Sequence, residues 1–343
     1  MSVKPISKLT AGDEKRAMAV MKKSIVVEGL SYAPTLDDPK GYMERVRKAG
    51  VTATHITVTL SSDNCRGAFK TIDEWYRMAE DVGVDFALTV KDIIKAKKEG
   101  KVCVIMGSQS AVMLEDDLSL VRVFQKLGMK IIQLAYAEQN YIGSGGDDTD
   151  GGVSHFGRKV IEEMNKQGIL IDVSHCGDKT VLDAIKYSEK PIAITHANPR
   201  KFNSHHRNKT DEQIIACAEK GGVIGLTAWT PISMVKKGVR PNIENFMDFV
   251  DYVVKLVGVD HVAFGLDLNP GWEYDSSGYY KWTKLYPSLA PKSFEERIVE
   301  GLEKVEDVKN IARGLVARGY SDEDMMKILG GNLLALFQKV WQP

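Results

Sequence analysis

Two histidines, His175 and His196, each end an apolar run of residues and directly follow a serine or threonine. The runs are ILIDVSH, beginning at Ile169, and PIAITH, beginning at Pro191; a third run, HVAFGLD, ends at Asp267. Two neutral imidazoles and one carboxylate at strand ends form a donor set for Zn²⁺ or a similar ion, with one position open to water. Bound water would supply hydroxide near neutral pH. The pattern therefore predicts a metal site, although a single histidine at a strand end is more often structural.

The elements that would position these residues repeat along the chain. Eight short β-branched runs begin at Ser24, Thr54, Val102, Lys130, Ile169, Pro191, Gly222 and His261. Helical patterns lie between them, and several end in glycine, as helix C-termini do. The runs are apolar on both faces, as in a buried parallel sheet. Eight strand-helix units predict an α/β fold of the (β/α)8 TIM-barrel type, with a doubly wound open sheet as the alternative.

The rest of the chain predicts one domain with added C-terminal helices. No Pro/Ser-rich linker or low-complexity segment interrupts residues 1–343, so we expect a single barrel domain over this range. Helical patterns follow Pro287, first over residues 294–319 and then over 321–341. Ser321, followed by Glu323 and Asp324, is typical of a helix start.

Composition argues against several classes of partner. The 46 basic and 46 acidic side chains give a formal net charge of zero, which favours neither nucleic acid nor a membrane surface. The four cysteines form no CxxC pair, which predicts free thiols in a reducing compartment. The N-terminal residues are charged and lack the apolar core of a signal peptide. We therefore expect a cytoplasmic protein with a small-molecule substrate.

Further candidates lie where other predicted strands end, which is where barrels of this type place their function. Glu28 has the same strand parity as Tyr32, so both should point into the barrel. Glu28 joins His175, His196 and Asp267 as a candidate metal ligand. Tyr32, His175, His196 and Asp267 are candidate acid/base groups. Candidate substrate-binding residues at these strand ends are Gln109, Tyr136 and Asn140.

An aromatic segment follows Asp267. It contains Trp272, Tyr274, Tyr279, Tyr280, Trp282 and Tyr286. Two interpretations are open: an ordered lid or dimer contact, or an aromatic wall that suits a flat or apolar substrate.

Three stretches carry a family resemblance. They are GGVSHFGRKVIEEMNKQGILIDVSH, PIAITHANPRKFNSHHRNKTDEQIIACAEKGGVIGL and HVAFGLDLNPG. The sequence resembles the membrane (renal) dipeptidase family over nearly its whole length, most specifically from Gly151 to Leu226. The resemblance implies a (β/α)8 barrel of the amidohydrolase type, usually a homodimer. It also implies a two-zinc site that cleaves dipeptides and related amides.

Part of the family site carries over to this sequence. His175 and His196 match the two histidines of the second zinc. Asp267 matches the last-strand aspartate, which ligates the first zinc and handles a proton. Arg207, in HHRN, matches the arginine that holds the substrate carboxylate, and a guanidinium fork suits that group.

The other part does not carry over. The family has Asp-Gly-His-Asn-Asp on the first strand, and its His and second Asp bind zinc; here Leu30 and Tyr32 stand at those places. Gln109 replaces the glutamate that bridges the two zincs, and an amide has no charge to hold two cations together. Tyr136 replaces a histidine that contacts substrate. These departures predict one metal ion or none.

Three hypotheses follow from this mixture. The first is a divergent enzyme that acts on a small carboxylate-bearing substrate with one zinc or similar ion, or with no metal. The second is an ordinary zinc-dependent dipeptidase with a rebuilt site. The third is a non-catalytic binding protein, which the retention of His175, His196, Asp267 and Arg207 argues against.

Overall fold

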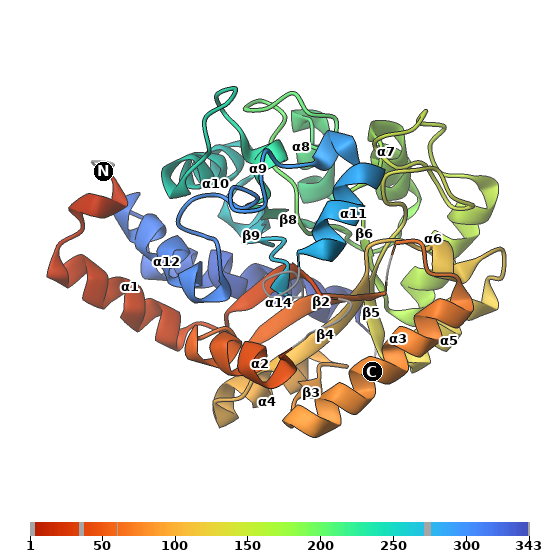
Figure 1. Cartoon of the computed structure of the whole chain (residues 1–343), viewed down its shortest axis with the longest axis horizontal. Coiled ribbons are helices and arrows are strands. Elements are labelled where there is room, and N and C mark those ends of the chain that lie inside the picture. The colour runs from red at the N-terminus through yellow and green to blue at the C-terminus, as the bar shows by residue number, and fades with distance from the viewer. Residues whose placement is uncertain (1–3, 34–37, 60, 271–275, 342–343) are drawn as a thin grey trace.

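The computed structural model describes residues 4–33, 38–59, 61–270 and 276–341. Its eight central strands are parallel and neighbour one another in chain order (Figure 1). They are β1 (Val27–Tyr32), β2 (Ala53–Thr59), β4 (Cys103–Ser108), β5 (Met129–Gln133), β6 (Leu170–Asp172), β7 (Ala193–Ile194), β8 (Val223–Leu226) and β9 (Val262–Phe264). Each of the eight predicted runs forms one of these strands. A short strand that we did not predict, β3 (Asp85–Phe86), pairs with β4 off this path.

The last strand returns to the first. Ser31 and Leu268 form a parallel bridge, and the Tyr32 amide donates to the Leu268 carbonyl at 2.8 Å. The Glu28 carboxylate adds a side-chain connection, because it accepts hydrogen bonds from the amides of Leu266 (2.8 Å) and Leu30 (3.2 Å). The sheet is therefore a nearly closed (β/α)8 barrel, and the open-sheet alternative is wrong.

Helices surround the sheet, as the sequence predicts (Figure 1). They are α1 (Ala11–Lys23), α2 (Pro39–Lys48), α3 (Cys65–Val82), α4 (Val90–Glu99), α5 (Ser119–Lys126), α6 (His155–Gln167), α7 (Asp178–Tyr187), α8 (Asp211–Glu219), α9 (Thr230–Ser233), α10 (Ile243–Val257) and α11 (Ser277–Leu285). Helix α3 illustrates how capping residues set the ends of these helices. The Asn64 side chain accepts a hydrogen bond from the Gly67 amide at its start, and Gly83 ends it in a left-handed conformation, at φ 70°.

One predicted helix is partly wrong. Residues 294–304 are not helical, and only α12 (Val308–Ala317) forms, after a 3-10 turn over Val305–Asp307. Ile298 instead pairs with Trp229 and Glu300 with Asn242 in isolated bridges, and Gly301 has φ 89°. Burial of apolar side chains in this extended segment outweighs its helical pattern.

The final segment closes the N-terminal end of the barrel. It comprises α13 (Asp322–Met326), a π-helical turn (Lys327–Gly331) and α14 (Asn332–Val340), and Ser321 caps α13 by accepting from the Asp324 amide. Leu333, Leu336 and Phe337 pack in one buried cluster with residues from the starts of the strands. A side chain at Gly330 would lie 2.2 Å from the Ile25 carbonyl oxygen, so this close approach requires glycine.

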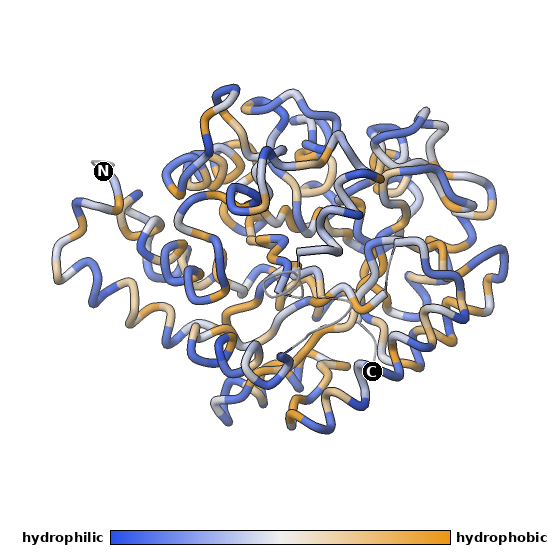
Figure 2. The backbone as a smooth tube through the Cα atoms, in the orientation of Figure 1, coloured by the Kyte–Doolittle hydropathy of each residue, from blue (hydrophilic) through white to orange (hydrophobic). Residues whose placement is uncertain are grey.

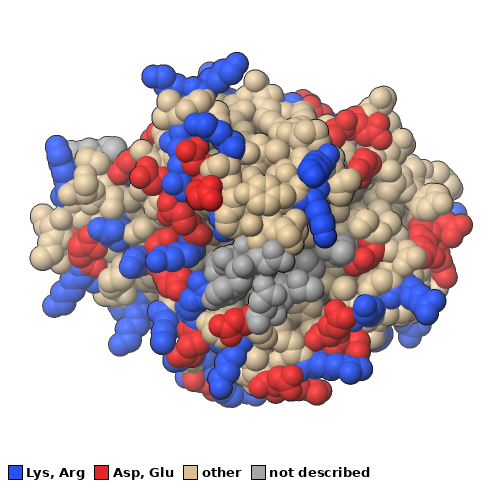
Figure 3. Space-filling view, in the orientation of Figure 1, with Lys and Arg blue, Asp and Glu red and all other residues tan. Residues whose placement is uncertain are grey.

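The hydropathy pattern agrees with this architecture: the strands are hydrophobic, whereas hydrophobic and hydrophilic residues alternate along the outer helices (Figure 2). Acidic and basic side chains are interspersed on the face shown in Figure 3. None of the four cysteines forms a disulfide. Among the described residues, no helix has the length and apolar character needed to cross a membrane.

Candidate active site

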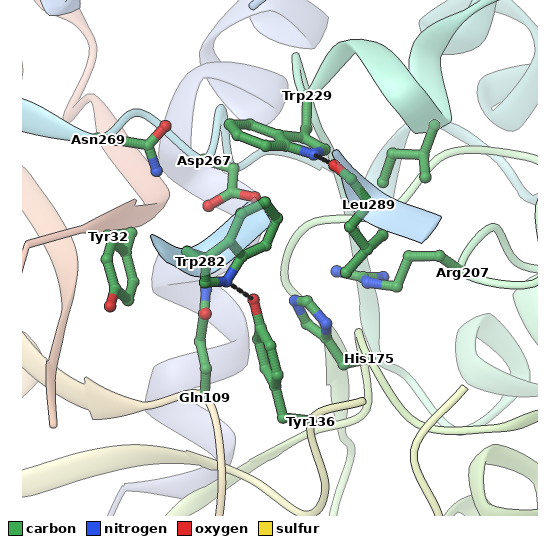
Figure 4. A pocket seen from close by; sticks show the side chains of 11 residues that line it. Tyr32, Gln109, Tyr136, His175, Arg207, Trp229, Asp267, Asn269, Trp282 and Leu289 are labelled. Carbon is green, nitrogen blue, oxygen red and sulfur yellow. Dashed lines mark hydrogen bonds between the residues drawn. The ribbon is translucent and has the colours of Figure 1, made fainter. Parts of the chain in front are cut away.

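A narrow cavity lies at the C-terminal ends of the strands (Figure 4). Its free space is about 380 Å³, but the centre of a water molecule can reach only about 20 Å³ of it. The lining residues come from strand ends and the segments that follow them, from α9 and α11, from the loop before α8 and from the 3-10 turn over Pro287–Leu289. They are Tyr32, Gln109, Tyr136, His175, Arg207, Trp229, Ile232, Asp267, Asn269, Trp282 and Leu289. The structure thus brings together six of the candidate ligand, acid/base and substrate-binding residues, together with Trp282 of the aromatic segment.

Three other candidates do not line the cavity. Asn140 bonds its own loop: its Nδ2 donates to the Leu134 carbonyl at 2.8 Å, and its Oδ1 accepts from the Ile142 amide at 2.8 Å. Glu28 lies in the seam between β1 and β9, where burial raises its pKa to about 7. Its oxygens accept from that seam, so it is not placed as a metal ligand. His196 is fully buried and lies behind His175 and Gln109, which line the cavity and contact it.

The two histidines contact each other directly. His175 Nε2 lies 3.0 Å from His196 Nε2, and the Gln109 amide nitrogen lies 3.4 Å from the same His196 atom. On the other side of His196, Nδ1 lies 2.7 Å from Thr195 Oγ1. Thr195 donates its only proton to Asp172 Oδ2 at 2.7 Å.

This chain of contacts assigns the tautomers. Because the Thr195 proton goes to Asp172, His196 Nδ1 must carry a proton and donate it to Thr195. His196 Nε2 is then an acceptor, so His175 Nε2 is the donor. Burial, followed by the positive charge of Arg207, lowers the pKa of both histidines well below its usual value, so both rings are neutral. His175 Nδ1 is left unprotonated and, among the described residues, unpartnered.

Aromatic rings hold His175 in place. Its imidazole stacks on Tyr136, with ring centroids 4.0 Å apart. The Tyr136 hydroxyl accepts a hydrogen bond from Trp282 Nε1 at 3.3 Å, and Trp282 belongs to α11. Tyr136 and Tyr286 also meet edge to face at 5.2 Å. Of the aromatic segment, Trp282 therefore lines the cavity and Tyr286 packs on Tyr136; Trp272 and Tyr274 lie outside the described residues.

Asp267 is held in an unusual backbone conformation, with φ 60°. Burial raises the pKa of its carboxyl to about 6, although Arg207 lowers it. Among the described residues, no side chain or amide donates a hydrogen bond to this carboxylate. Nearby, Asn269 Oδ1 is buried and also lacks a described partner. The cavity therefore contains two acceptor groups to which no described residue donates.

Arg207 lies opposite this acidic side in a loop between β7 and α8. It is 3% exposed, and its guanidinium donates to the Ser174 carbonyl and, at 2.8 Å, to the His196 carbonyl. Its Nε has no partner among the described residues. The nearby loop acid Asp211 does not pair with Arg207; its carboxylate accepts a hydrogen bond from the Tyr252 hydroxyl at 2.7 Å. Arg207 thus fixes two strand ends and keeps donors for an anion.

The donor set does not fit a two-metal centre. No group of three His, Cys, Asp or Glu side chains within the described part of the chain is arranged to hold an ion. Leu30 offers no ligand atom, and burial raises the pKa of the Tyr32 hydroxyl, which keeps it neutral. Gln109 directs its amide nitrogen at His196. Carboxylates that would balance two cations are therefore missing.

Several important residues escaped the sequence interpretation. Asp172 and Thr195 were visible in ILIDVSH and PIAITH, each before its histidine, but their contact joins two strands and has no local signal. Trp229 and Asn269 follow β8 and β9, so their places after predicted strands were the available signal.

The comparisons with known proteins identify the family. The model of the membrane dipeptidase family, peptidase family M19, matches residues 14–289. The chain belongs to this family. Members of the M19 family are metal-dependent hydrolases of the dipeptidase type, and the predicted resemblance is confirmed.

Relatives within and around the M19 family cover this chain well. Dipeptidase tcpJ of Claviceps purpurea is 27% identical over 80% of this chain and 60% of its own length; dipeptidase 3 of Rattus norvegicus is 24% identical over 83% and 54%. The chain therefore spans less than two thirds of these relatives. An amidohydrolase from Pseudomonas aeruginosa has a TM-score of 0.86 and 31% identity, covering 95% of this chain and 99% of that structure.

A more distant structure shares the fold. It is a metallopeptidase from Rhodobacter sphaeroides, solved with a phosphinate mimic of the dipeptide L-Ala-D-Ala. Its TM-score is 0.79 at 18% identity, with 93% of this chain and 100% of that chain covered.

Proposed function

We propose that this M19-family protein is a divergent enzyme that acts on a small carboxylate-bearing substrate with one divalent ion or none. The observation that carries the proposal is the direct contact between His175 Nε2 and His196 Nε2, beside Gln109 rather than an acid. Such a set can hold at most one weakly bound ion, because neutral ligands do not balance two dications.

The chain's own groups supply acid/base chemistry in this proposal. His175 is neutral, fixed by stacking on Tyr136, and keeps an unprotonated Nδ1, so it can accept a proton. Asp267 faces the same cavity without a described hydrogen-bond donor and is the second proton-handling group. Arg207 orients the substrate by its carboxylate. Water exclusion by Trp229 and Trp282 strengthens each of these interactions.

The second candidate is an ordinary M19 dipeptidase, which the family membership favours. The test is metal content by elemental analysis, with hydrolysis of L-Ala-D-Ala before and after chelation. We expect fewer than two ions per chain and dipeptide turnover far below the ~10 s⁻¹ typical of enzymes. Two tightly bound ions, with activity that chelation abolishes, would establish the second candidate.

The same proposal includes a cytoplasmic homodimer that binds neither nucleic acid nor membrane. The balanced charge of the sequence and the mixed surface of Figure 3 support this part. Light scattering on the purified protein measures the oligomeric state, and a monomeric mass would contradict the dimer.

A further inference from the structure

We propose that the cavity receives the alkylated ammonium group of a small zwitterion, between Asp267 and the rings of Trp229, Trp282 and Tyr32. This inference rests on the proposed function, because it assigns the cationic part of the same carboxylate-bearing substrate. Its ligand class is an N-alkylated amino acid or betaine.

The Asp267 carboxylate requires a positive partner. Asp267 is partly buried and faces the cavity, and no described residue donates a hydrogen bond to its carboxylate. A ligand that displaces water from a carboxylate must pair with it or donate to it, because an unpaired carboxylate is costly to remove from water. In the resemblance drawn above, the matching aspartate binds a metal together with residues that are replaced here by Leu30 and Tyr32. Arg207 influences Asp267 through its charge, but its terminal nitrogens donate to the carbonyls of Ser174 and His196. A cation brought by the ligand completes this arrangement.

The walls beside Asp267 present ring faces (Figure 4). The rings of Trp229 and Trp282 are nearly perpendicular, at 87°, with centroids 5.5 Å apart. Their N–H groups already donate within the protein, Trp229 to the Leu289 carbonyl at 2.9 Å and Trp282 to Tyr136 at 3.3 Å. Ring faces attract cations, and several aromatic rings around one pocket are a known way to bind quaternary ammonium ligands.

An alkylated ammonium fits better than a primary one. A primary ammonium has three donors, and each requires an acceptor when water is excluded. The two Asp267 oxygens and the buried Asn269 Oδ1 match those donors in number, so the preference comes from the remaining wall, which is largely ring surface. Alkyl groups on nitrogen need no acceptors and contact the rings directly, while Asp267 balances the charge.

The other end of the cavity receives the anion. Arg207 Nε is buried and unpartnered among the described residues, so a ligand carboxylate can accept from it. The cavity is too narrow as it stands, since water reaches only about 20 Å³ of it. Entry of a ligand therefore requires a shift of wall residues such as Trp282, which will alter tryptophan fluorescence.

Calorimetric titration of the full chain with three probes tests the proposal. The probes are trimethylammonioacetate, its uncharged isostere 3,3-dimethylbutanoate, and glycine. We expect the trimethylammonium compound to bind at least about tenfold more tightly than either of the others, since only its alkylated cation gains both desolvated cation–π contacts and the charge of Asp267. Tryptophan emission should change with the same saturation curve.

Two variants locate the cation. Asp267→Asn should weaken the trimethylammonium probe and should not weaken 3,3-dimethylbutanoate. Trp282→Leu should weaken the trimethylammonium probe by a larger factor than the isostere, because only the cation loses a cation–π contact. Tyr280→Leu, an exposed ring on the same helix that is 54% exposed, is the matched control and should change neither. Melting curves identify any variant that fails to fold, and the comparison of probes on the unaltered chain does not depend on the variants.

The outcomes separate this inference from the proposed function. Equal affinity for the trimethylammonium probe and its isostere would overturn the ammonium site while leaving a carboxylate site in place. Glycine binding as tightly as the trimethylammonium probe would overturn the preference for an alkylated group. Absence of binding by all three carboxylates would overturn both.

Discussion

His175 Nε2 and His196 Nε2 lie 3.0 Å apart, so one imidazole donates a hydrogen bond to the other. The direction of that bond is set at a distance, by the Asp172 carboxylate that takes the Thr195 proton. Thr195 then accepts from His196 Nδ1, which makes His196 Nε2 the acceptor. A carboxylate on β6 therefore decides which nitrogen of a cavity histidine is free to act as a base.

The first prediction concerns this chain of hydrogen bonds. Nitrogen NMR of labelled protein should show His196 protonated at Nδ1 and His175 at Nε2, because the Thr195 hydroxyl has only one proton to donate. Thr195→Val removes the bridge and should mix the tautomers of His196. Thr195→Ser keeps the hydroxyl and is the control. An unchanged His196 spectrum in the valine variant would contradict the assignment.

The second prediction restores the missing ligands. Leu30→His, Tyr32→Asp and Gln109→Glu together should raise the zinc retained after dialysis toward about two ions per chain, because carboxylates then balance the charge. The same triple variant with Gln109→Met instead of Gln109→Glu lacks the bridging carboxylate and should retain less. Elemental analysis gives the number of ions. Two ions already present in the unaltered protein would show that Leu30, Tyr32 and Gln109 do not weaken the metal site.

The third prediction concerns Arg207. Arg207→Lys should weaken binding of a carboxylate ligand by more than roughly 1 kcal/mol, because a lysine lacks the planar fork and charge-assisted bonds contribute roughly 1.5–3 kcal/mol each. It should also lower the melting temperature, because the guanidinium holds the carbonyls of Ser174 and His196. Arg158→Lys, on an exposed helix face, is the control. A lower melting temperature with unchanged ligand affinity would leave Arg207 a purely structural residue.

The fourth prediction concerns a buried lysine near the site. Lys209 donates to the Cys176 carbonyl at 2.9 Å, and burial, followed by the charge of Arg207, lowers its pKa from 10.5 to about 7. Between these two values the unfolded chain binds a proton that the folded chain does not. The contribution of Lys209 to the free energy of unfolding therefore rises with pH between about 7 and 10.5 and is constant at lower pH.

Lys209→Met should remove part of this rise. Thermal melting of both proteins near pH 7 and near pH 10 measures it, and the gain at the higher pH should be smaller in the variant. Lys159→Met, at an exposed position on α6, corrects for the loss of a lysine as such. Parallel pH profiles for the unaltered chain and Lys209→Met would refute the assignment.

The sequence predicts the barrel because its signals are local and repeated. Eight β-branched runs alternate with helical patterns, and each run became a strand. The helix prediction for residues 294–304 failed because Ile298 pairs with Trp229, far away in the sequence. No local pattern reveals such a tertiary contact. Strand ends also located His175 and Asp267, and the family resemblance located Arg207, in one cavity.

The roles of two candidate residues could be assigned only from the three-dimensional structure. Glu28 was expected to point at the site, and it lies instead in the seam, because the amides of Leu30 and Leu266 satisfy its carboxylate. Asn140 was expected near the substrate, and its amide is used within its own loop. In both cases the sequence located the residue, but the hydrogen-bond partners, which decide its use, come from backbone groups.

The position of α14 has a consequence for how the chain is made. Leu333, Leu336 and Phe337 close the N-terminal end of the barrel, yet a ribosome adds them after all eight strands have emerged. Until then the nascent chain exposes the starts of its strands, which is apolar surface that invites aggregation or a chaperone. Pausing of translation before residue 332 should therefore prolong chaperone contact, whereas pausing between earlier strands should matter less. Helix α14 therefore completes the core at the end of the barrel opposite to the candidate site, and it does so last.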